Sequence, residues 1–254
     1  MTSNVPAERR RTVVVLGEGE HKAIIRDPDR VDLIDDPEAQ FVTFPGNSGE
    51  QNALSELLRT QDLLRPGTLA VQSPYDTERY VAVGEAMTEF TVEKFLILTR
   101  LAKVLGAKEV TFEDVRIDQK KSSWTTDGSV STITTKVETE VNGRIAAQLH
   151  ERLRGKHVFP GSPPDIAGAR ELLARLRLTG DPQLATLIEL RDGDNAIREQ
   201  EILLNATREA SGNINAALRI AGGPAKLKLA GFSSELARQW ENKLEVEVRT
   251  LVKF

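Results

Sequence analysis

The apolar residues in the first half of the chain alternate between strand-like runs and helix-like stripes. Strands are predicted for four runs rich in β-branched and aromatic residues: 12–16, 41–44, 69–72 and 109–117. Apolar residues three and four positions apart predict two helices, one opening at Glu50 and one over about 85–105. The order strand, helix, strand, helix, strand over residues 41–117 favours a parallel or mixed sheet with two crossover helices. The last strand changes phase at Glu113 and Asp114, as at a β-bulge.

The pattern becomes polar after residue 117, with many Lys, Ser and Thr residues. Asp127-Gly128 and Asn142-Gly143 are hairpin-type dipeptides, and they predict an antiparallel meander. Its strands would run to about 125, to 141, and through 145–149. The last segment equally fits a helix to Leu153, because its apolar residues are four positions apart.

A linker signal at Pro160–Pro164 precedes a helical block. Asp165 is a candidate N-cap for a helix to Leu178, and Asp181 with Pro182 at N1 starts another. Residues 196–221 carry both helical and extended signals. Alternating apolar residues at 225–232 and 239–248 then predict a C-terminal β-hairpin.

These elements predict an α+β fold: an N-terminal α/β layer with a mixed sheet, an antiparallel β meander, a helical block and a C-terminal β-hairpin. The expected division is residues 1–160 for the layer and meander and 161–254 for the remainder; the alternative is that the whole chain forms one continuous domain. Whether all strands share one sheet stays open.

Composition narrows the function classes. The 254 residues include 34 Lys and Arg against 38 Asp and Glu, so the net charge of −4 argues against a dedicated nucleic-acid binder. There is no cysteine, which excludes disulfides and thiolate metal sites and favours a cytoplasmic protein. No apolar run approaches ~20 residues, so we expect no constitutive membrane span.

Two loops are the candidate ligand site. The turn Gly46-Asn47-Ser48-Gly49 lies between a predicted strand and the helix opened by Glu50, where main-chain N–H groups can bind an anion. Ser73, Tyr75 and Asp76 follow the strand at 69–72. If the strands 41–44 and 69–72 are parallel neighbours, both loops leave the sheet at one edge, where α/β folds bind ligands. Capping and turn formation explain the same residues without a ligand.

Catalytic and metal-binding patterns are missing from the sequence. The histidines, His21, His150 and His157, have no recognised ligand spacing, and the acids around His21 lack the pattern of a Ca²⁺ loop. We read the stretch from Glu18 to Asp29 as a solvated acidic loop. The sequence also lacks a Gly-x-Ser-x-Gly elbow. No catalytic residue, metal site or cofactor is therefore predicted.

The leading functional hypothesis is a non-catalytic cytoplasmic protein that acts by self-assembly, as a homo-oligomer, or by binding a protein partner. Edge strands, including one ending in Leu251-Val252-Lys253-Phe254, would accept an added strand. The two β ribbons around a helical block resemble, in element order only, pore formers of the perforin and gasdermin kind, which implies conditional membrane insertion of a hairpin. The alternative is an enzyme or sensor that binds a phosphate-bearing small molecule at loops 46–50 and 73–76.

Overall fold

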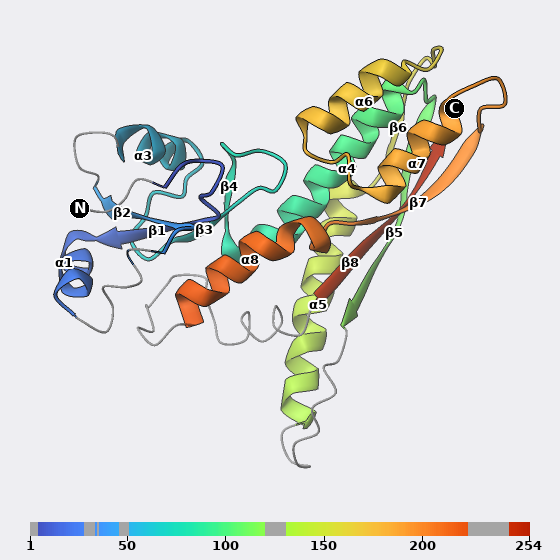
Figure 1. The fold of residues 1–254 in the computed structure, drawn as a ribbon. Helices are drawn as coiled ribbons and strands as arrows, with labels where there is room; N and C mark the ends of the chain where they lie inside the picture. Colours follow the sequence, from blue (N-terminus) through green and yellow to red (C-terminus); the bar gives the residue numbers. More distant parts are fainter. Residues whose placement is uncertain (1–4, 28–33, 35, 46–50, 120–130, 223–243) are drawn as a thin grey trace. The chain divides into compact units, whose positions relative to one another are not determined.

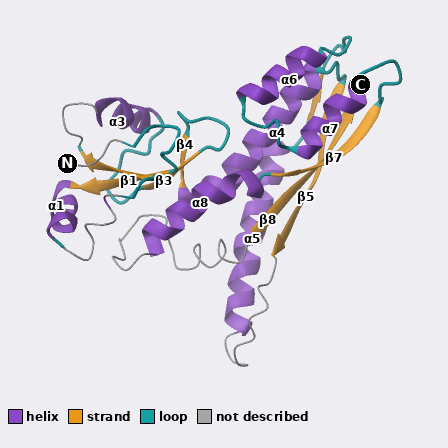
Figure 2. Cartoon of the chain, in the orientation of Figure 1, coloured by secondary structure: helices purple, strands orange, loops and turns teal. Residues whose placement is uncertain are grey.

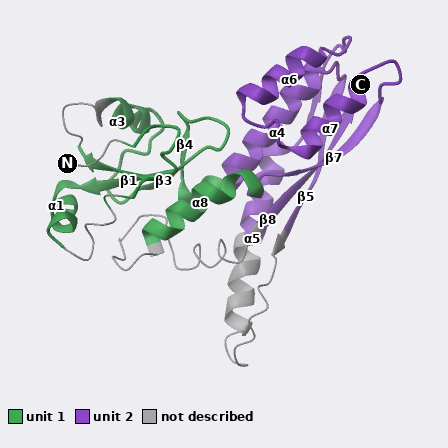
Figure 3. Cartoon of the chain, in the orientation of Figure 1, with its two compact units in different colours: residues 1–86, 208–242 green, residues 87–207, 243–254 purple. Residues whose placement is uncertain are grey.

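The computed structural model describes residues 5–27, 34, 36–45, 51–119, 131–222 and 244–254 (Figure 1). The chain forms two compact units, and each contains segments from both halves of the sequence (Figure 3). Unit 1 comprises residues 1–86 and 208–242, and unit 2 comprises residues 87–207 and 243–254. Helices and strands occur in both units, as the predicted α+β class requires (Figure 2).

Unit 1 contains a mixed four-stranded sheet with the order β2-β1-β3-β4. Its strands are β1 (Thr12–Gly17), β2 (Ala39–Phe44), β3 (Leu69–Gln72) and β4 (Tyr80–Ala82). β1 is parallel to β2 and antiparallel to β3, which is antiparallel to β4. The predicted mixed sheet is thus confirmed, with β1 at its centre because Val13, Val14, Val15 and Leu16 are fully buried.

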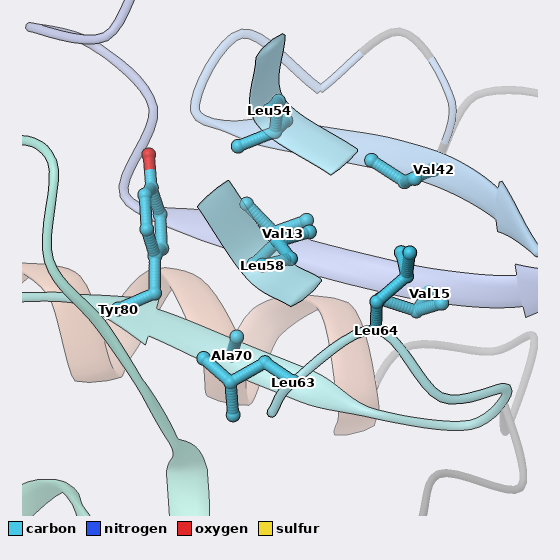
Figure 4. Packing of buried hydrophobic residues seen from close by; sticks show 9 residues of the cluster. All are labelled: Val13, Val15, Val42, Leu54, Leu58, Leu63, Leu64, Ala70 and Tyr80. Atoms are coloured by element: carbon cyan, nitrogen blue, oxygen red, sulfur yellow. The ribbon is translucent and has the colours of Figure 1, made fainter. Parts of the chain in front are cut away.

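Within the described residues, unit 1 includes the helices α1 (Glu18–Arg26), α3 (Gln51–Thr60) and α8 (Thr207–Gly222) and the short 3₁₀ helix η1 (Val83–Glu85). α3 packs its predicted leucine face on the sheet, and the buried cluster around it consists of Val13, Val15, Val42, Leu54, Leu58, Leu63, Leu64, Ala70 and Tyr80 (Figure 4). α8 is tied to this unit by Asn213, whose side-chain Nδ2 donates to the Gln72 carbonyl at 2.8 Å.

Residues 18–26 form α1 and not the acidic loop that the sequence suggested. Glu18 and Glu20 lie in the first turn and Arg26 in the last, which complements the helix dipole at both ends. Clustered acids in this stretch therefore favour the beginning of a helix.

Unit 2 contains an antiparallel four-stranded sheet with the order β6-β5-β8-β7. Its strands are β5 (Glu109–Gln119), β6 (Lys156–Val158), β7 (Glu199–Asn205) and β8 (Leu244–Lys253). The expected bulge in β5 is confirmed between Phe112 and Asp114. Val246, Val248, Thr250 and Val252 of β8 are 0% exposed, whereas the residues between them are partly exposed, so only one face of the sheet is covered.

Four helices accompany this sheet: α4 (Ala86–Val104), α5 (Ser131–Leu153), α6 (Ile166–Arg175) and α7 (Pro182–Arg191). α5 packs against β5, and α7 packs against β7. The predicted caps are present, because Asp165 accepts a hydrogen bond from the Gly168 N–H and Asp181 accepts from those of Gln183 and Leu184.

Three sequence-based expectations need correction. The segment 131–153 is one helix, α5, and not two strands of a meander, so only the helical alternative for 145–153 is confirmed. Ile145, Leu149 and Leu153 are all buried on one helical face, and this packing outweighs the turn preference of Asn142-Gly143.

The second predicted crossover does not return to the first sheet, because α4 leads from unit 1 into unit 2 and β5 belongs to the second sheet. The segment Leu251–Phe254 is also not at an edge. β8 pairs with β5 on one side and β7 on the other, and the Phe254 N–H donates to the Arg198 carbonyl at 2.8 Å. Of the predicted C-terminal hairpin, residues 225–232 and 239–243 lie outside the described residues, whereas the strand pair β7–β8 is present.

Gly143→Ala tests the helical state of α5. Gly143 is exposed inside the helix and an added Cβ would meet no atom within 4 Å. We expect stabilisation of about 0.5–1 kcal/mol in urea denaturation, because alanine loses less backbone entropy in a helix. A turn at Asn142-Gly143 would instead need a positive φ at Gly143, so a destabilised variant would contradict the helix.

A buried ion pair joins three elements of unit 2. Lys94 of α4 places its Nζ 2.7 Å from Asp181 Oδ2 and 2.6 Å from the Asn205 carbonyl at the end of β7. The two side chains are only 3% and 6% exposed. Asp181 also caps α7, so one carboxylate connects α4 to the start of α7.

Lys94→Met should lower the free energy of unfolding by about 3–5 kcal/mol, because it leaves a buried carboxylate without its cation. Adding Asp181→Asn to that variant should recover part of the loss, since the amide oxygen still caps α7 without a charge. Urea denaturation of the wild type, both single variants and the double variant measures the coupling. Strictly additive effects would show that the pair does not act as a unit.

Candidate functional site

The predicted site at the two loops depended on the order of the strands in unit 1. β1 lies between β2 and β3, and β3 runs opposite to β2. The carboxyl ends of β2 and β3 therefore lie at opposite ends of the sheet, so the expectation of parallel neighbours is wrong. Gly46, Asn47, Ser48 and Gly49 lie outside the described residues.

Ser73, Tyr75 and Asp76 lie in the turn between β3 and β4, which side-chain hydrogen bonds stabilise. Ser73 Oγ accepts a hydrogen bond from the Tyr75 N–H at 3.0 Å, and Asp76 Oδ1 accepts from the Glu78 N–H at 2.9 Å. Ser73 and Tyr75 are buried. Such bonds are typical of side chains that hold a turn, and this role accounts for the Ser73 and Asp76 side chains.

The three histidines lie apart from one another along the fold. His21 is in α1, where burial lowers its pKa. His150 lies edge-on to the Phe112 ring, with 5.3 Å between centroids, and His157 lies 5.9 Å from the Phe95 ring. Within the part of the chain that the structure describes, no three His, Asp or Glu side chains are grouped as metal ligands.

A polar cavity with basic side chains lies in unit 2, where α7 ends and β7 begins. Its volume is about 400 Å³. We call it the cationic pocket, and its lining consists of Gly106, Lys108, Ser162, Arg191, Ala196, Arg198 and Phe254. Three of these residues are cations, and no carboxylate side chain of the described residues lines the cavity.

Arg191 is the buried cation of the pocket, with 8% of its surface exposed. Its Nε and Nη2 donate to the Leu105 carbonyl, each at 3.2 Å, and Nη1 donates to the Ile197 carbonyl at 2.6 Å. The guanidinium carbon lies 4.1 Å from the centre of the Phe254 ring. These contacts use three of the five N–H donors of an arginine.

The partners of Arg191 are neutral. Leu105 directly follows α4, so its carbonyl belongs to the negative end of that helix, and this offsets part of the cost of burying the cation. Burial disfavours the charged form and lowers the pKa of the Arg191 guanidinium. A buried guanidinium that has no carboxylate partner among the described residues is poised for an anion.

Lys108 and Arg198 add positive charge at the exposed rim. Lys108 Nζ donates to the main-chain oxygen of Phe254 at 3.2 Å. Arg198 immediately precedes β7, and its side chain is exposed. The two cations extend the attraction of the pocket for an anion toward solvent.

A second hollow continues along α7 and β7. We call it the α7–β7 groove; its volume is about 300 Å³, and Leu187, Leu190 and residues 200–203 contribute to its lining. Leu190 precedes Arg191 in α7, and Gln200 follows Arg198 by two residues in the chain. The groove and the cationic pocket are therefore consecutive along the same two elements.

The sequence contains one signal for Arg191. Leu184, Leu187 and Ile188 form the buried apolar face of α7, and Arg191 continues that face at helical spacing. A cation on an apolar face must be paired inside the protein. Its carbonyl partners come from segments distant in the chain, so only the fold reveals them.

Comparison with known proteins adds no family: no protein-family model, no curated protein and no solved structure matches this chain. Among the described residues, no helix is both long enough and apolar enough to span a bilayer.

Gly106→Ala tests the wall of the cationic pocket. Gly106 has φ +85°, and a Cβ there would collide with the Ser162 main-chain oxygen. The matched control is Gly193→Ala, with φ +88° and no atom within 4 Å of the added carbon. The control should lose about 1–2 kcal/mol for the left-handed backbone, and Gly106→Ala clearly more, in urea denaturation. Equal losses of stability in the two variants would show that the loop containing Ser162 moves away from the added carbon at no cost.

Proposed function

We propose that the protein works without catalysis, by binding an anionic group of a ligand or partner in the cationic pocket. The observation that carries the proposal is Arg191, a residue more than nine-tenths buried whose guanidinium contacts only neutral groups among the described residues. The proposal keeps the partner-binding hypothesis from the sequence and moves it to a site in unit 2. The lack of cysteine supports a cytoplasmic setting.

Electrostatics favours a carboxylate or phosphate as the bound group. A unit charge 4 Å from the guanidinium gains about 4 kcal/mol at an effective dielectric constant of 20. Planar guanidinium groups bind both anions through paired N–H donors, and Arg191 has two donors left. Lys108 and Arg198 add long-range attraction.

The lining supports binding rather than catalysis. Among the described residues around the cavity there is neither an imidazole nor a carboxylate side chain that could transfer a proton. Self-assembly, hairpin insertion into membranes and a phosphate site at the loops 46–50 and 73–76 stay predictions from the sequence.

The test measures the melting temperature with inorganic phosphate, sulfate or acetate. At 100 times its dissociation constant, a ligand stabilises by about 2.7 kcal/mol, which should raise the melting temperature by roughly 5–10 °C. The shift should shrink in Lys108→Gln and Arg198→Gln, which remove exposed rim charges. Arg175→Gln is the matched control, since Arg175 is exposed and lies outside the lining.

The effect should also weaken with added sodium chloride because of screening. The proposal fails if none of the three anions raises the melting temperature. It also fails if the rim variants respond to the anions as fully as the wild type does.

A further inference from the structure

β7 has an open edge among the described residues. β7 pairs only with β8, and Arg198 accepts a hydrogen bond from the Phe254 N–H. In an antiparallel ladder this register turns the N–H and C=O groups of the odd-numbered residues away from β8. Glu199, Glu201 and Leu203 therefore point their N–H groups outward, and these groups have no partner within the described chain.

The open edge forms one side of the α7–β7 groove, and Leu187 and Leu190 of α7 lie on the opposite side. The outward Glu201 carbonyl accepts a hydrogen bond from Gln200 Nε2 at 2.9 Å, which a peptide N–H would replace. Outward N–H groups beside a hollow lined in part by leucines suit an extended peptide, whose main chain pairs with the edge while alternate side chains enter the hollow. The sheet is antiparallel throughout, so an added strand that continues its pattern runs opposite to β7.

The direction of such a strand determines which of its ends meets the cationic pocket. A strand antiparallel to β7 ends, at its carboxyl terminus, beside the beginning of β7. Arg198 immediately precedes that point, and Arg191 and Lys108 line the same pocket. The terminal carboxylate of the peptide would therefore arrive beside Arg198, close to the pocket that Arg191 lines.

We propose that the ligand is the carboxyl-terminal segment of a partner protein, bound as an added strand on β7 with its carboxylate in the cationic pocket. This inference rests on the proposed function and specifies its ligand class. A segment from the interior of a chain would leave the cations without an anion, and a free small anion would leave the strand edge unused.

The register also specifies the side chains. With the last peptide residue opposite Glu199, the residues one and three places before it lie opposite Gln200 and Ile202. Those two positions face the covered side of the sheet, where Ile202 is buried. The peptide should therefore carry apolar residues there, and a basic residue between them would share the exposed Glu201 carboxylate with Arg249, whose Nε lies 3.1 Å from Glu201 Oε1.

The probe is the N-acetylated peptide Gly-Ser-Leu-Lys-Leu-Ala with a free carboxylate, and its carboxamide is the matched control. We expect titration calorimetry to show binding of the acid at least 10-fold tighter than that of the amide, because a charged hydrogen-bonded contact is lost. Arg198→Gln should weaken binding of the acid peptide and leave binding of the amide peptide nearly unchanged.

Glu201→Pro tests the strand pairing, because it removes an outward N–H and keeps the ladder to β8. Glu201→Ala loses the same side chain and keeps the N–H, so it is the control. We expect about 10-fold weaker binding for the proline variant than for the alanine variant, with circular dichroism confirming that both fold.

Equal binding of acid and amide peptides, or of the proline and alanine variants, would overturn the inference. If phosphate or acetate raises the melting temperature but the peptide does not bind, the inference falls and the proposed anion site stands. If neither the small anions nor the peptide bind, both proposals fall.

Discussion

The ion pair between Lys94 and Asp181 is the interaction on which the arrangement of unit 2 depends. Two buried charges are stable only as partners, so α4 and α7 must meet at this point. Lys94 also holds the last carbonyl of β7. The beginning of α7 and the end of β7 are thereby attached to the same helix, and the groove between them keeps its width.

The other end of α7 is held by a second buried cation. Arg191 connects it to the carbonyl of Leu105, where α4 has just ended, and to the ring of Phe254. α7 is therefore attached to the neighbourhood of α4 at both ends, once through a carboxylate and once through carbonyls. The Lys94–Asp181 contact pairs a cation with an anion, whereas Arg191 contacts only neutral groups among the described residues. We therefore regard the first contact as structural and the second as part of a candidate binding site.

Much of the fold was predictable because its signals are local. The first three strands of unit 1, the bulge in β5 and the caps at Asp165 and Asp181 each depend on a few neighbouring residues, whereas the short strand β4 was not predicted. The sequence-based predictions failed where packing between residues far apart in the chain determines the local structure. Asn142-Gly143 favours a turn locally, yet the buried face of Ile145, Leu149 and Leu153 makes α5 continuous. The segment 196–221 carried both helical and extended signals because it contains β7 and most of α8 in succession.

The candidate site was not predictable in the same way. Whether the Ser73–Asp76 turn lies beside the loop 46–50 depends on the strand order, which the sequence does not reveal. In the structure β1 separates β2 from β3, the strands that these two loops follow. The cationic pocket collects residues from the turn before β5, the loop before α6 and both ends of the α7–β7 connection. No local spacing relates them, although the place of Arg191 on an apolar helical face was a usable sign.

The central place of β8 has a consequence for biosynthesis. Residues 244–253 form the strand that joins β5 to β7, and β5 was synthesised more than a hundred residues earlier. While the nascent chain emerges from the ribosome, β5 has only the three residues of β6 as a neighbour, and β7 has none among the strands described. Pairings over such separations close slowly. We therefore expect the sheet of unit 2 to stay incomplete, with exposed strand edges that chaperones could bind, until β8 has been synthesised.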